Sequence, residues 1–275
     1  DVVLAGGTES MSNAVFYVRD ARWGVGTGNV EFVDALTEGH FQSQPPETYG
    51  RYNMGATAEN IAEHMGITRE EQDAFSLQSQ RRAIAAIDSG RFKDEIIPMV
   101  IPQGRKKDPI VFDTDEFPNR TTNEEKMAKL KPVFNIEVHE DGKMYNSKEL
   151  TGTVTAGSSS GRNDGASSML LMSEEKAAEL GLKPLAKIIG MGQSGCDPQQ
   201  MGLGPVYAVP KALKNAGLTI DDIQLIELNE AFAAQALGCI HSLGWEDKMD
   251  IINPNGSGIS LGHPIGCTGC RIIVT

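Results

Sequence analysis

The sequence predicts an α/β fold, because short apolar runs alternate along it with amphipathic helical segments. Its 275 residues are 40% hydrophobic and 23% charged, as is usual for a globular protein. At ~150 residues per domain this length suggests about two domains. The formal net charge of −12 argues against a general nucleic-acid-binding protein, since polyanions would be repelled.

Seven short runs between turn residues are predicted strands: Val2–Ala5, Glu95–Ile101, Gly152–Ala156, Ala166–Met172, Leu185–Met191, Ile223–Leu228 and Met249–Asn253. Three helices are predicted between them, each opened by a capping residue or proline and closed by glycine. They run from Thr68 to Gly90, from Ser173 to Gly181 and from Pro205 to Gly217, the last with Ala208, Val209, Ala212, Leu213 and Ala216 on its buried side. No apolar run is long enough to predict a membrane-spanning helix.

The stretch Gly104–Glu149 differs from the rest of the chain in its charge. It holds nine of the 25 Lys and Arg residues together with ten acidic residues, and it has few apolar runs. We interpret it as an excursion over the surface of the core. A solvated, partly mobile loop is the alternative interpretation.

A glycine-rich segment with one central histidine predicts a functional loop. It runs from Asn253 to Gly269 and contains five glycines around His263. Glycine permits tight turns and close approach of a ligand, while histidine can act as an acid, a base or a hydrogen-bond donor. The spacing of Gly256, Gly258 and Gly262 is one residue too long for a dinucleotide-binding fingerprint, and no Gly-Lys-Ser/Thr indicates a P-loop.

Asn229 is a second candidate, because it follows an apolar run and precedes the small residues up to Ala236. At the end of a strand its amide could face a substrate oxygen or hold a water molecule. A plain helix cap is the alternative. Cys267 and Cys270 have the C-x-x-C spacing, but they follow a glycine loop late in the chain, which disfavours thioredoxin-like redox chemistry. With only four cysteines, the composition favours a reducing, cytoplasmic location.

Together with three further segments, these motifs resemble the thiolase family over essentially the whole chain. The further segments are Val3–Ser12, Tyr52–Asn60 and Gly152–Gly165. The resemblance implies a thiolase-like fold, with two similar βαβαβ-type core halves and an inserted loop domain, incomplete at both termini. Its expected parts are residues 1–15 with 151–180 (first core half), 16–150 (loop domain) and 181–275 (second core half).

The resemblance also implies roles for individual residues. His263 would activate the acylated cysteine and donate to the thioester oxygen, and Asn229 would hold the water that completes this oxyanion site. The residues expected to contact coenzyme A or its pantetheine arm are Met54, Ser160, Met201, Ala231, Phe232 and Arg120, although a shift of one residue in the alignment would put Asn119 in place of Arg120. Coenzyme A thioesters would be the substrates, with no separate cofactor or metal, and the assembly a homodimer or homotetramer.

The implied reaction is the reversible Claisen condensation of two acetyl-CoA molecules through an acyl-cysteine. A degradative 3-ketoacyl-CoA thiolase and a non-catalytic relative that binds CoA or lipid remain alternatives, and Asn53 stands where many biosynthetic thiolases carry histidine. The nucleophilic cysteine of the family lies upstream of Val2–Ala5, and its second catalytic cysteine lies beyond Thr275. We therefore expect the 275-residue chain to have no turnover on its own.

Overall fold

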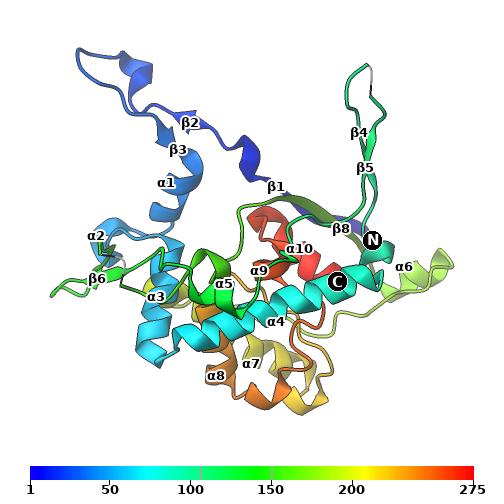
Figure 1. The fold of residues 1–275 in the computed structure, drawn as a ribbon. Coiled ribbons are helices and arrows are strands. Elements are labelled where there is room, and N and C mark those ends of the chain that lie inside the picture. The colour runs from blue at the N-terminus through cyan, green and yellow to red at the C-terminus, as the bar shows by residue number, and fades with distance from the viewer. Residues whose placement is uncertain (106, 150) are drawn as a thin grey trace.

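The computed structural model of the chain describes residues 1–105, 107–149 and 151–275, and Figure 1 labels its elements. The strands are β1 (Val2–Ser10), β2 (Phe16–Tyr17), β3 (Val33–Asp34), β4 (Met99–Ile101), β5 (Ile110–Phe112), β6 (Ile136–Val138), β7 (Met144–Asn146) and β8 (Asp164–Met172). The helices are α1 (Ala35–Phe41), α2 (Pro46–Tyr49), α3 (Met54–Met65), α4 (Arg69–Asp88), α5 (Glu124–Ala128), α6 (Glu174–Glu179), α7 (Gly204–Ala216), α8 (Ala233–Leu243), α9 (Gly258–Leu261) and α10 (Ile265–Val274). The mixed helix and strand content confirms the predicted α/β class. Within the described ranges, no helix is both long and apolar enough to cross a bilayer.

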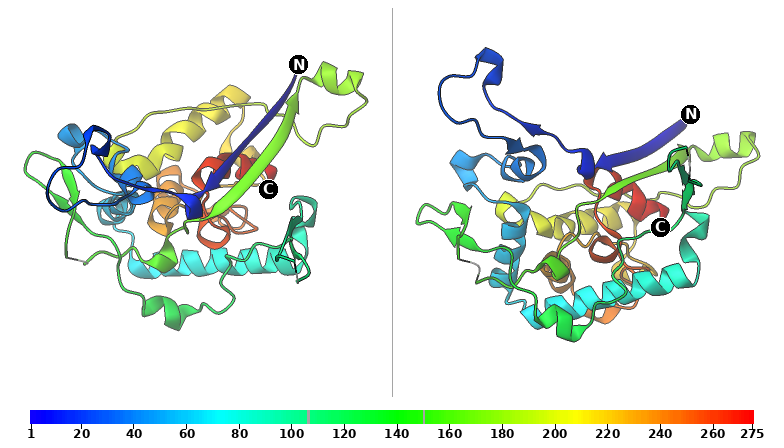
Figure 2. Two further views of the ribbon diagram at one scale, coloured as in Figure 1. Left: turned by 90° about the horizontal axis from the view of Figure 1, so that it is seen from above. Right: turned by 45° about the horizontal axis from the view of Figure 1, so that its top comes forward.

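The longest strands, β1 and β8, form a two-stranded antiparallel sheet. Their register runs without a break from Val2 opposite Met172 to Ser10 opposite Asp164. Helix α10 packs against both strands, as Figure 2 shows with β1 in dark blue, β8 in light green and α10 in red. The sheet therefore brings the start of the chain to the segment that carries His263.

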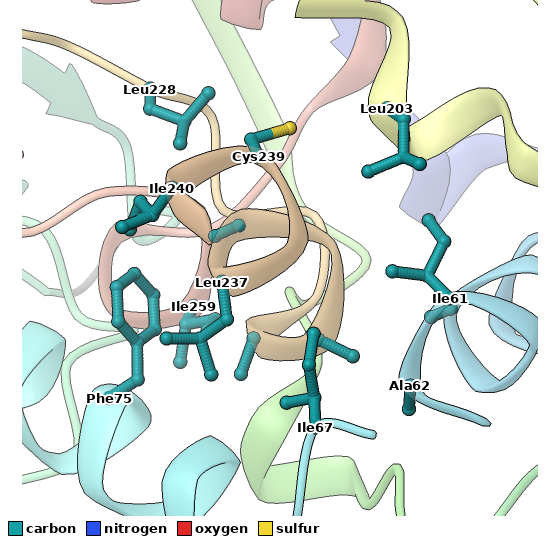
Figure 3. Packing of buried hydrophobic residues seen from close by; sticks show 14 of the residues in the cluster. Ile61, Ala62, Ile67, Phe75, Leu203, Leu228, Leu237, Cys239, Ile240 and Ile259 are labelled. Carbon is teal, nitrogen blue, oxygen red and sulfur yellow. The ribbon is translucent and has the colours of Figure 1, made fainter. Parts of the chain in front are cut away.

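The hydrophobic core is built around α8. Ala233, Ala234 and Ala236 have no exposed surface, and their small side chains let neighbouring elements approach the helix closely. Figure 3 shows α8 surrounded by apolar side chains of α3, α4 and the segment before α7, including Ile61, Phe75 and Leu203. This packing holds the residues just before α8, which include Asn229.

The three predicted helices are confirmed as α4, α6 and α7. At the start of α4, Thr68 and Glu71 form the predicted capping box, with the Glu71 carboxylate 2.7 Å from the Thr68 backbone nitrogen. Ser173 caps α6 by accepting a hydrogen bond from the Lys176 backbone. The predicted buried side of α7 is only half-buried along its length, so that part of the prediction is wrong.

The strand predicted at Gly152–Ala156 does not form. The backbone amides of Thr153 and Val154 donate to the Glu59 carboxylate at 2.7–3.0 Å instead of to a neighbouring strand. Thr155 then caps a short turn of 3₁₀ helix. A side chain from α3 thus supplies the hydrogen bonds that a second strand would otherwise make.

Four other predicted strands are absent or shortened. Leu185–Met191 is extended but pairs with no described strand, and instead Asn215 of α7 donates to the Met191 carbonyl at 2.8 Å. Ile226 and Ile252 form a single parallel bridge, so the runs Ile223–Leu228 and Met249–Asn253 lie side by side without forming a longer ladder. Of Glu95–Ile101, only β4 is a strand.

The charged stretch Gly104–Glu149 contains both projecting and packed parts. The β4–β5 hairpin projects from the body of the molecule (Figure 1). Farther along, Met127 is buried, and the Arg69 guanidinium of α4 donates to the Met127 and Leu130 carbonyls at 2.6 and 3.0 Å. From α5 onwards the stretch therefore contacts the core, as the excursion interpretation predicts.

Gly7 and Gly266 bring β1 and α10 into backbone contact, so we expect Gly7→Ala to disturb the His263 loop. A Cβ at Gly7 would overlap the Gly266 carbonyl oxygen. The expected cost is about 1–3 kcal/mol in the free energy of unfolding, as for other overpacked sites. Urea denaturation measures it. Gly269→Ala is the matched control, because a Cβ on that α10 glycine meets nothing within 4 Å; equal stability of the two variants would contradict the proposed overlap.

Candidate functional site

His263 lies between two short helices, in a position that the glycines around it make possible. Gly262 ends α9 with φ of +93°, and Pro264 then begins α10. A Cβ at Gly262 would lie 2.5 Å from the Asn163 amide group, so only glycine fits there. Asn163 in turn accepts a hydrogen bond from the His263 backbone nitrogen at 3.2 Å. The loop is therefore held to the segment just before β8.

Thr268 determines which nitrogen of the His263 ring carries the proton. The Thr268 hydroxyl donates its only hydrogen to the Pro264 carbonyl at 3.0 Å. With its hydrogen on that carbonyl, the Thr268 oxygen, 2.7 Å from His263 Nδ1, can accept from the ring, and this arrangement favours the tautomer with the hydrogen on Nδ1. In the neutral ring Nε2 then carries no hydrogen, and a nitrogen lone pair is what a general base requires.

The surroundings of His263 keep its ring neutral. Burial lowers the pKa of the imidazole, and the positive charge of Arg271 lowers it further. A neutral imidazole near neutral pH can accept a proton from a thiol and return it later. The structure thus gives His263 the protonation state of a base.

Asn229 lies against the reactive side of that ring. Its Nδ2 is 3.4 Å from His263 Nε2, while no described residue hydrogen-bonds its buried Oδ1. The helix-cap alternative is wrong, because α8 begins at Ala233 with Phe232 in the capping position. Asn229 and His263, predicted from separate motifs, therefore form one polar pair.

Asn253 fixes the backbone before Asn229. Its side chain accepts a hydrogen bond from the Leu228 nitrogen at 2.7 Å and donates to the Leu228 carbonyl at 2.8 Å. This exchange imitates the pairing of a neighbouring strand. It anchors the chain directly ahead of Asn229 although no continuous sheet runs there.

Glu230 is a fully buried carboxylate directly after Asn229. It accepts hydrogen bonds from Ser79 Oγ at 2.5 Å, Asn253 Nδ2 at 2.8 Å and the Ile259 nitrogen at 3.3 Å. Burial raises the pKa of this carboxyl, and the three donors oppose that rise. Glu230 therefore ties α4 and the glycine-rich loop to the Asn229 segment.

The predicted tunnel residues Ala231, Phe232 and Ser160 lie together. The Ser160 nitrogen donates to the Ala231 carbonyl at 2.9 Å, and Phe232 forms a backbone bridge with Ser159. The Phe232 ring meets the Phe134 ring edge to face, with centroids 6.0 Å apart. Ala231, Phe232 and Ser160, predicted from separate segments, are therefore neighbours in the fold.

The remaining predicted contacts lie farther from the pair. Met54 opens α3, and a Cβ on the next residue, Gly55, would overlap the Phe134 ring. Met201 is exposed in the turn before α7. Arg120 is exposed and forms a two-pronged ion pair with Asp88 at 2.6 and 3.0 Å, so its guanidinium already has a protein partner.

The four cysteines are free thiols, and none of them hydrogen-bonds His263. Burial raises the pKa of the Cys267 thiol, which disfavours the thiolate that redox or nucleophilic chemistry needs. The redox interpretation of the C-x-x-C spacing therefore gains no support. Across residues 1–105, 107–149 and 151–275, no group of three His, Cys, Asp or Glu side chains could hold a metal ion.

Several residues that shape the site were missed in the sequence. They are Asn163, Thr268, Glu230 and Phe134, which hold the His263 backbone, its ring, the Asn229 segment and the Phe232 ring. Thr268 had a local signal, because it lies five residues after His263 in the first turn of a helix. From there its hydroxyl can reach back to the ring. The other three act across long stretches of sequence and gave no local signal.

The contact between Thr268 and the His263 ring predicts that loss of the Thr268 hydroxyl lowers kcat. Thr268→Val removes the acceptor of Nδ1–H at nearly constant volume, and we expect it to lower kcat by about 10–100-fold, as outer partners of metal-binding histidines do. Thr268→Ser retains the hydroxyl and is the matched control. Steady-state kinetics of both variants in the whole protein test this. Equal kcat values for Val and Ser would mean that the ring is oriented by something else.

Two family models match the chain. One, described as the N-terminal domain of thiolase, covers residues 1–175, and one for the C-terminal domain covers residues 182–275. The acetyl-CoA acetyltransferase of Chromobacterium violaceum is 50% identical over 275 residues, as is that of Syntrophomonas wolfei over 277 residues. Each alignment covers all of this chain and 65% of the relative, so the chain spans somewhat less than two thirds of their length.

Solved structures show the same similarity. The acetyl-CoA acetyltransferase of Bacillus anthracis matches with a TM-score of 0.88 and 42% identity over all of this chain and 64% of its own. Human mitochondrial 3-ketoacyl-CoA thiolase matches with a TM-score of 0.87 and 40% identity over the same shares. The predicted thiolase-like fold is confirmed, and the chain belongs to the thiolase family.

Proposed function

We propose that this chain supplies His263 and Asn229 to a thiolase-type acyl transfer, the reversible condensation of two acetyl-CoA molecules to acetoacetyl-CoA. The observation that carries the proposal is the Asn229–His263 pair, in which Asn229 Nδ2 lies 3.4 Å from His263 Nε2. Relatives named acetyl-CoA acetyltransferase, 45–50% identical to this chain, support the choice of acetyl-CoA.

In the proposed reaction, His263 Nε2 takes the proton of a cysteine thiol. The thiolate attacks the carbonyl of the first acetyl-CoA and releases coenzyme A, which leaves an acyl-cysteine. The departing coenzyme A takes that proton back from His263. The second catalytic cysteine of the family, which the resemblance places outside this chain, removes a proton from the methyl group of a second acetyl-CoA, and the resulting carbanion attacks the acyl carbonyl and regenerates the thiolate. Negative charge develops on a thioester oxygen in the condensation, and the Asn229 amide and the His263 ring stabilise it. The thiol is not one of the four described cysteines, because none of them hydrogen-bonds His263.

A degradative 3-ketoacyl-CoA thiolase is the second candidate. The TM-score of the human mitochondrial 3-ketoacyl-CoA thiolase, 0.87, lies between those of the Bacillus anthracis and Syntrophomonas wolfei acetyl-CoA acetyltransferases, 0.88 and 0.85. In this chain Asn53 caps α3 by accepting from the Ala56 nitrogen at 3.0 Å. The two candidates differ in the acyl chain length of their preferred substrate. A kinetic comparison of short and long acyl-CoA substrates decides between them.

The substrates, the residues that contact CoA, the assembly and the location of the protein are parts of the same proposal. Coenzyme A thioesters serve as substrates without a separate cofactor, and a human relative has been solved in complex with CoA. Met54, Ser160, Met201, Ala231 and Phe232 contact the CoA substrate. Arg120 would have to exchange its Asp88 partner for a phosphate to bind the nucleotide end. A homodimer or homotetramer in the cytoplasm completes the proposal.

The test uses the whole protein that contains this chain. We expect thiolysis of acetoacetyl-CoA and condensation of acetyl-CoA, with lower kcat/KM on longer 3-ketoacyl-CoA substrates. The isolated 275-residue chain should show no turnover above its His263→Ala variant, since it places no thiol at Nε2. Higher kcat/KM on long substrates would favour the degradative candidate. CoA binding without turnover by the whole protein would favour the non-catalytic alternative.

A further inference from the structure

Arg271 lies on α10, eight residues after His263, and has no role in the reaction described above. Its side chain is 20% exposed. Nη2 donates to Ser257 Oγ at 3.1 Å. Nη1 lies 3.9 Å from the Glu227 carboxylate, whose side chain is 8% exposed. An arginine this enclosed has lost most of its hydration, so its contacts must compensate for that loss.

Ser257 connects this guanidinium to the backbone ahead of Asn229. Its hydroxyl donates to the Leu228 carbonyl at 3.0 Å. Because a hydroxyl has one hydrogen, Ser257 can only accept from Arg271, which fixes the direction of the chain of bonds. Arg271, Ser257 and Leu228 therefore form a continuous link from α10 to the residue adjoining Asn229.

The same arginine stands on α10, the helix that begins just after His263, so its positive charge acts on the imidazole. Burial is the first cause that lowers the pKa of the imidazole, and Arg271 is the one charged group that adds to it. The titratable groups that act on Arg271 itself are Glu227, Glu230, Cys267 and Asp115. Of these, the Glu227 carboxyl has its pKa raised to about 7 by burial, and no described residue hydrogen-bonds either of its oxygens.

We propose that Arg271 is a positioning residue for the Asn229–His263 pair: it holds Asn229 in place through Ser257 and the Leu228 carbonyl, and it keeps a positive charge towards the imidazole. The effect of Arg271 on kcat rests on the proposed acyl transfer, whereas its effect on the pKa of His263 does not. Glu227 acts as the counter-charge that makes an arginine tolerable at this depth.

The sign of the charge effect follows from the position of Arg271. A nearby positive charge disfavours the imidazolium, so loss of Arg271 raises the pKa of His263. His263 is then protonated over a wider pH range and is a base only at higher pH. Substitution of Arg271 alone would also leave a buried carboxylate without its partner, which is strongly destabilising. A double variant, Glu227→Gln with Arg271→Met, removes both charges and avoids that problem.

The experiment that separates these effects is an NMR titration of histidine-labelled chain. The His263 signal is assigned by its loss in His263→Ala, and its pKa is measured in wild type, Arg271→Met, Arg271→Lys and the double variant. We expect a raised His263 pKa in Arg271→Met and in the double variant, and a value close to wild type in Arg271→Lys. Arg82→Met is the matched control, because Arg82 donates to the Ile252 and Met249 carbonyls just before the glycine-rich loop and is not among the groups that shift the pKa of His263.

Kinetics of the whole protein then test the positioning role. Ser257→Ala keeps the charge but breaks the link, so we expect a lower kcat with an unchanged acid limb of the pH profile. Arg271→Met should lower kcat and also move the acid limb to higher pH. A His263 pKa that is the same in wild type, Arg271→Met and the double variant would overturn the charge role. A wild-type kcat in Ser257→Ala would overturn the positioning role. Absence of turnover in wild type would contradict the proposed acyl transfer and leave the titration result standing.

Discussion

Replacing His263 with alanine in the whole protein is expected to lower kcat by about 10²–10⁴-fold, the range for loss of a general base. Burial and Arg271 lower the pKa of the ring, which favours its neutral form, and the contact of Nδ1 with Thr268 favours the tautomer in which Nε2 carries the lone pair. Without it, the thiol is deprotonated only by solvent. Stopped-flow measurement of CoA release in the first half-reaction detects the loss directly.

His139 provides the matched control for this variant. It is exposed in the turn after β6, far in sequence from the glycine-rich loop, and pairs there with Glu137. We expect His139→Ala to retain the wild-type kcat. The His263 pH profile should fall on the acid side, as protonation removes the base, and that limb should vanish in His263→Ala. A His263→Ala variant with more than about a tenth of the wild-type kcat would exclude His263 as the base.

Replacing Asn229 with alanine is expected to lower kcat by about 10²–10³-fold with little change in KM, as when one oxyanion donor is removed. The reason is that the amide acts where negative charge develops, and this charge is absent in the bound substrate. Its Nδ2 already lies at the reactive nitrogen of His263, 3.4 Å away. Initial rates over a range of acetyl-CoA concentrations separate kcat from KM.

Stability must be measured beside these rates, because Asn229 is flanked by residues that hold the fold together. Asn253 and Glu230 make the structural contacts there, whereas the Asn229 side chain makes none with the core. We therefore expect Asn229→Ala to unfold at nearly the same urea concentration as wild type. Asn215→Ala is the control for loss of an amide elsewhere, because it removes the hydrogen bond from Asn215 of α7 to the Met191 carbonyl. A normal kcat with a raised KM would make Asn229 a ground-state binding residue.

Local sequence signals accounted for the helices and for the two polar residues of the site. The capping box at Thr68 and Glu71 specified the start of α4, since both its partners lie within one turn. The glycines around His263 indicated a tight loop, and Gly262 does take a φ that favours glycine. The motif at Asn229 likewise pointed to the second member of the pair. These features are short-range, so one sequence can show them.

Tertiary structure alone decided which extended runs became strands and which residues support the pair. Gly152–Ala156 had the composition of a strand, yet Glu59 of α3 satisfied its amides from more than ninety residues away. Glu230 and Arg271 gained their roles only because packing brought α4, α10 and the glycine-rich loop together. The physical reason is that a strand or a buried charge requires a partner, and in this protein those partners are distant in sequence.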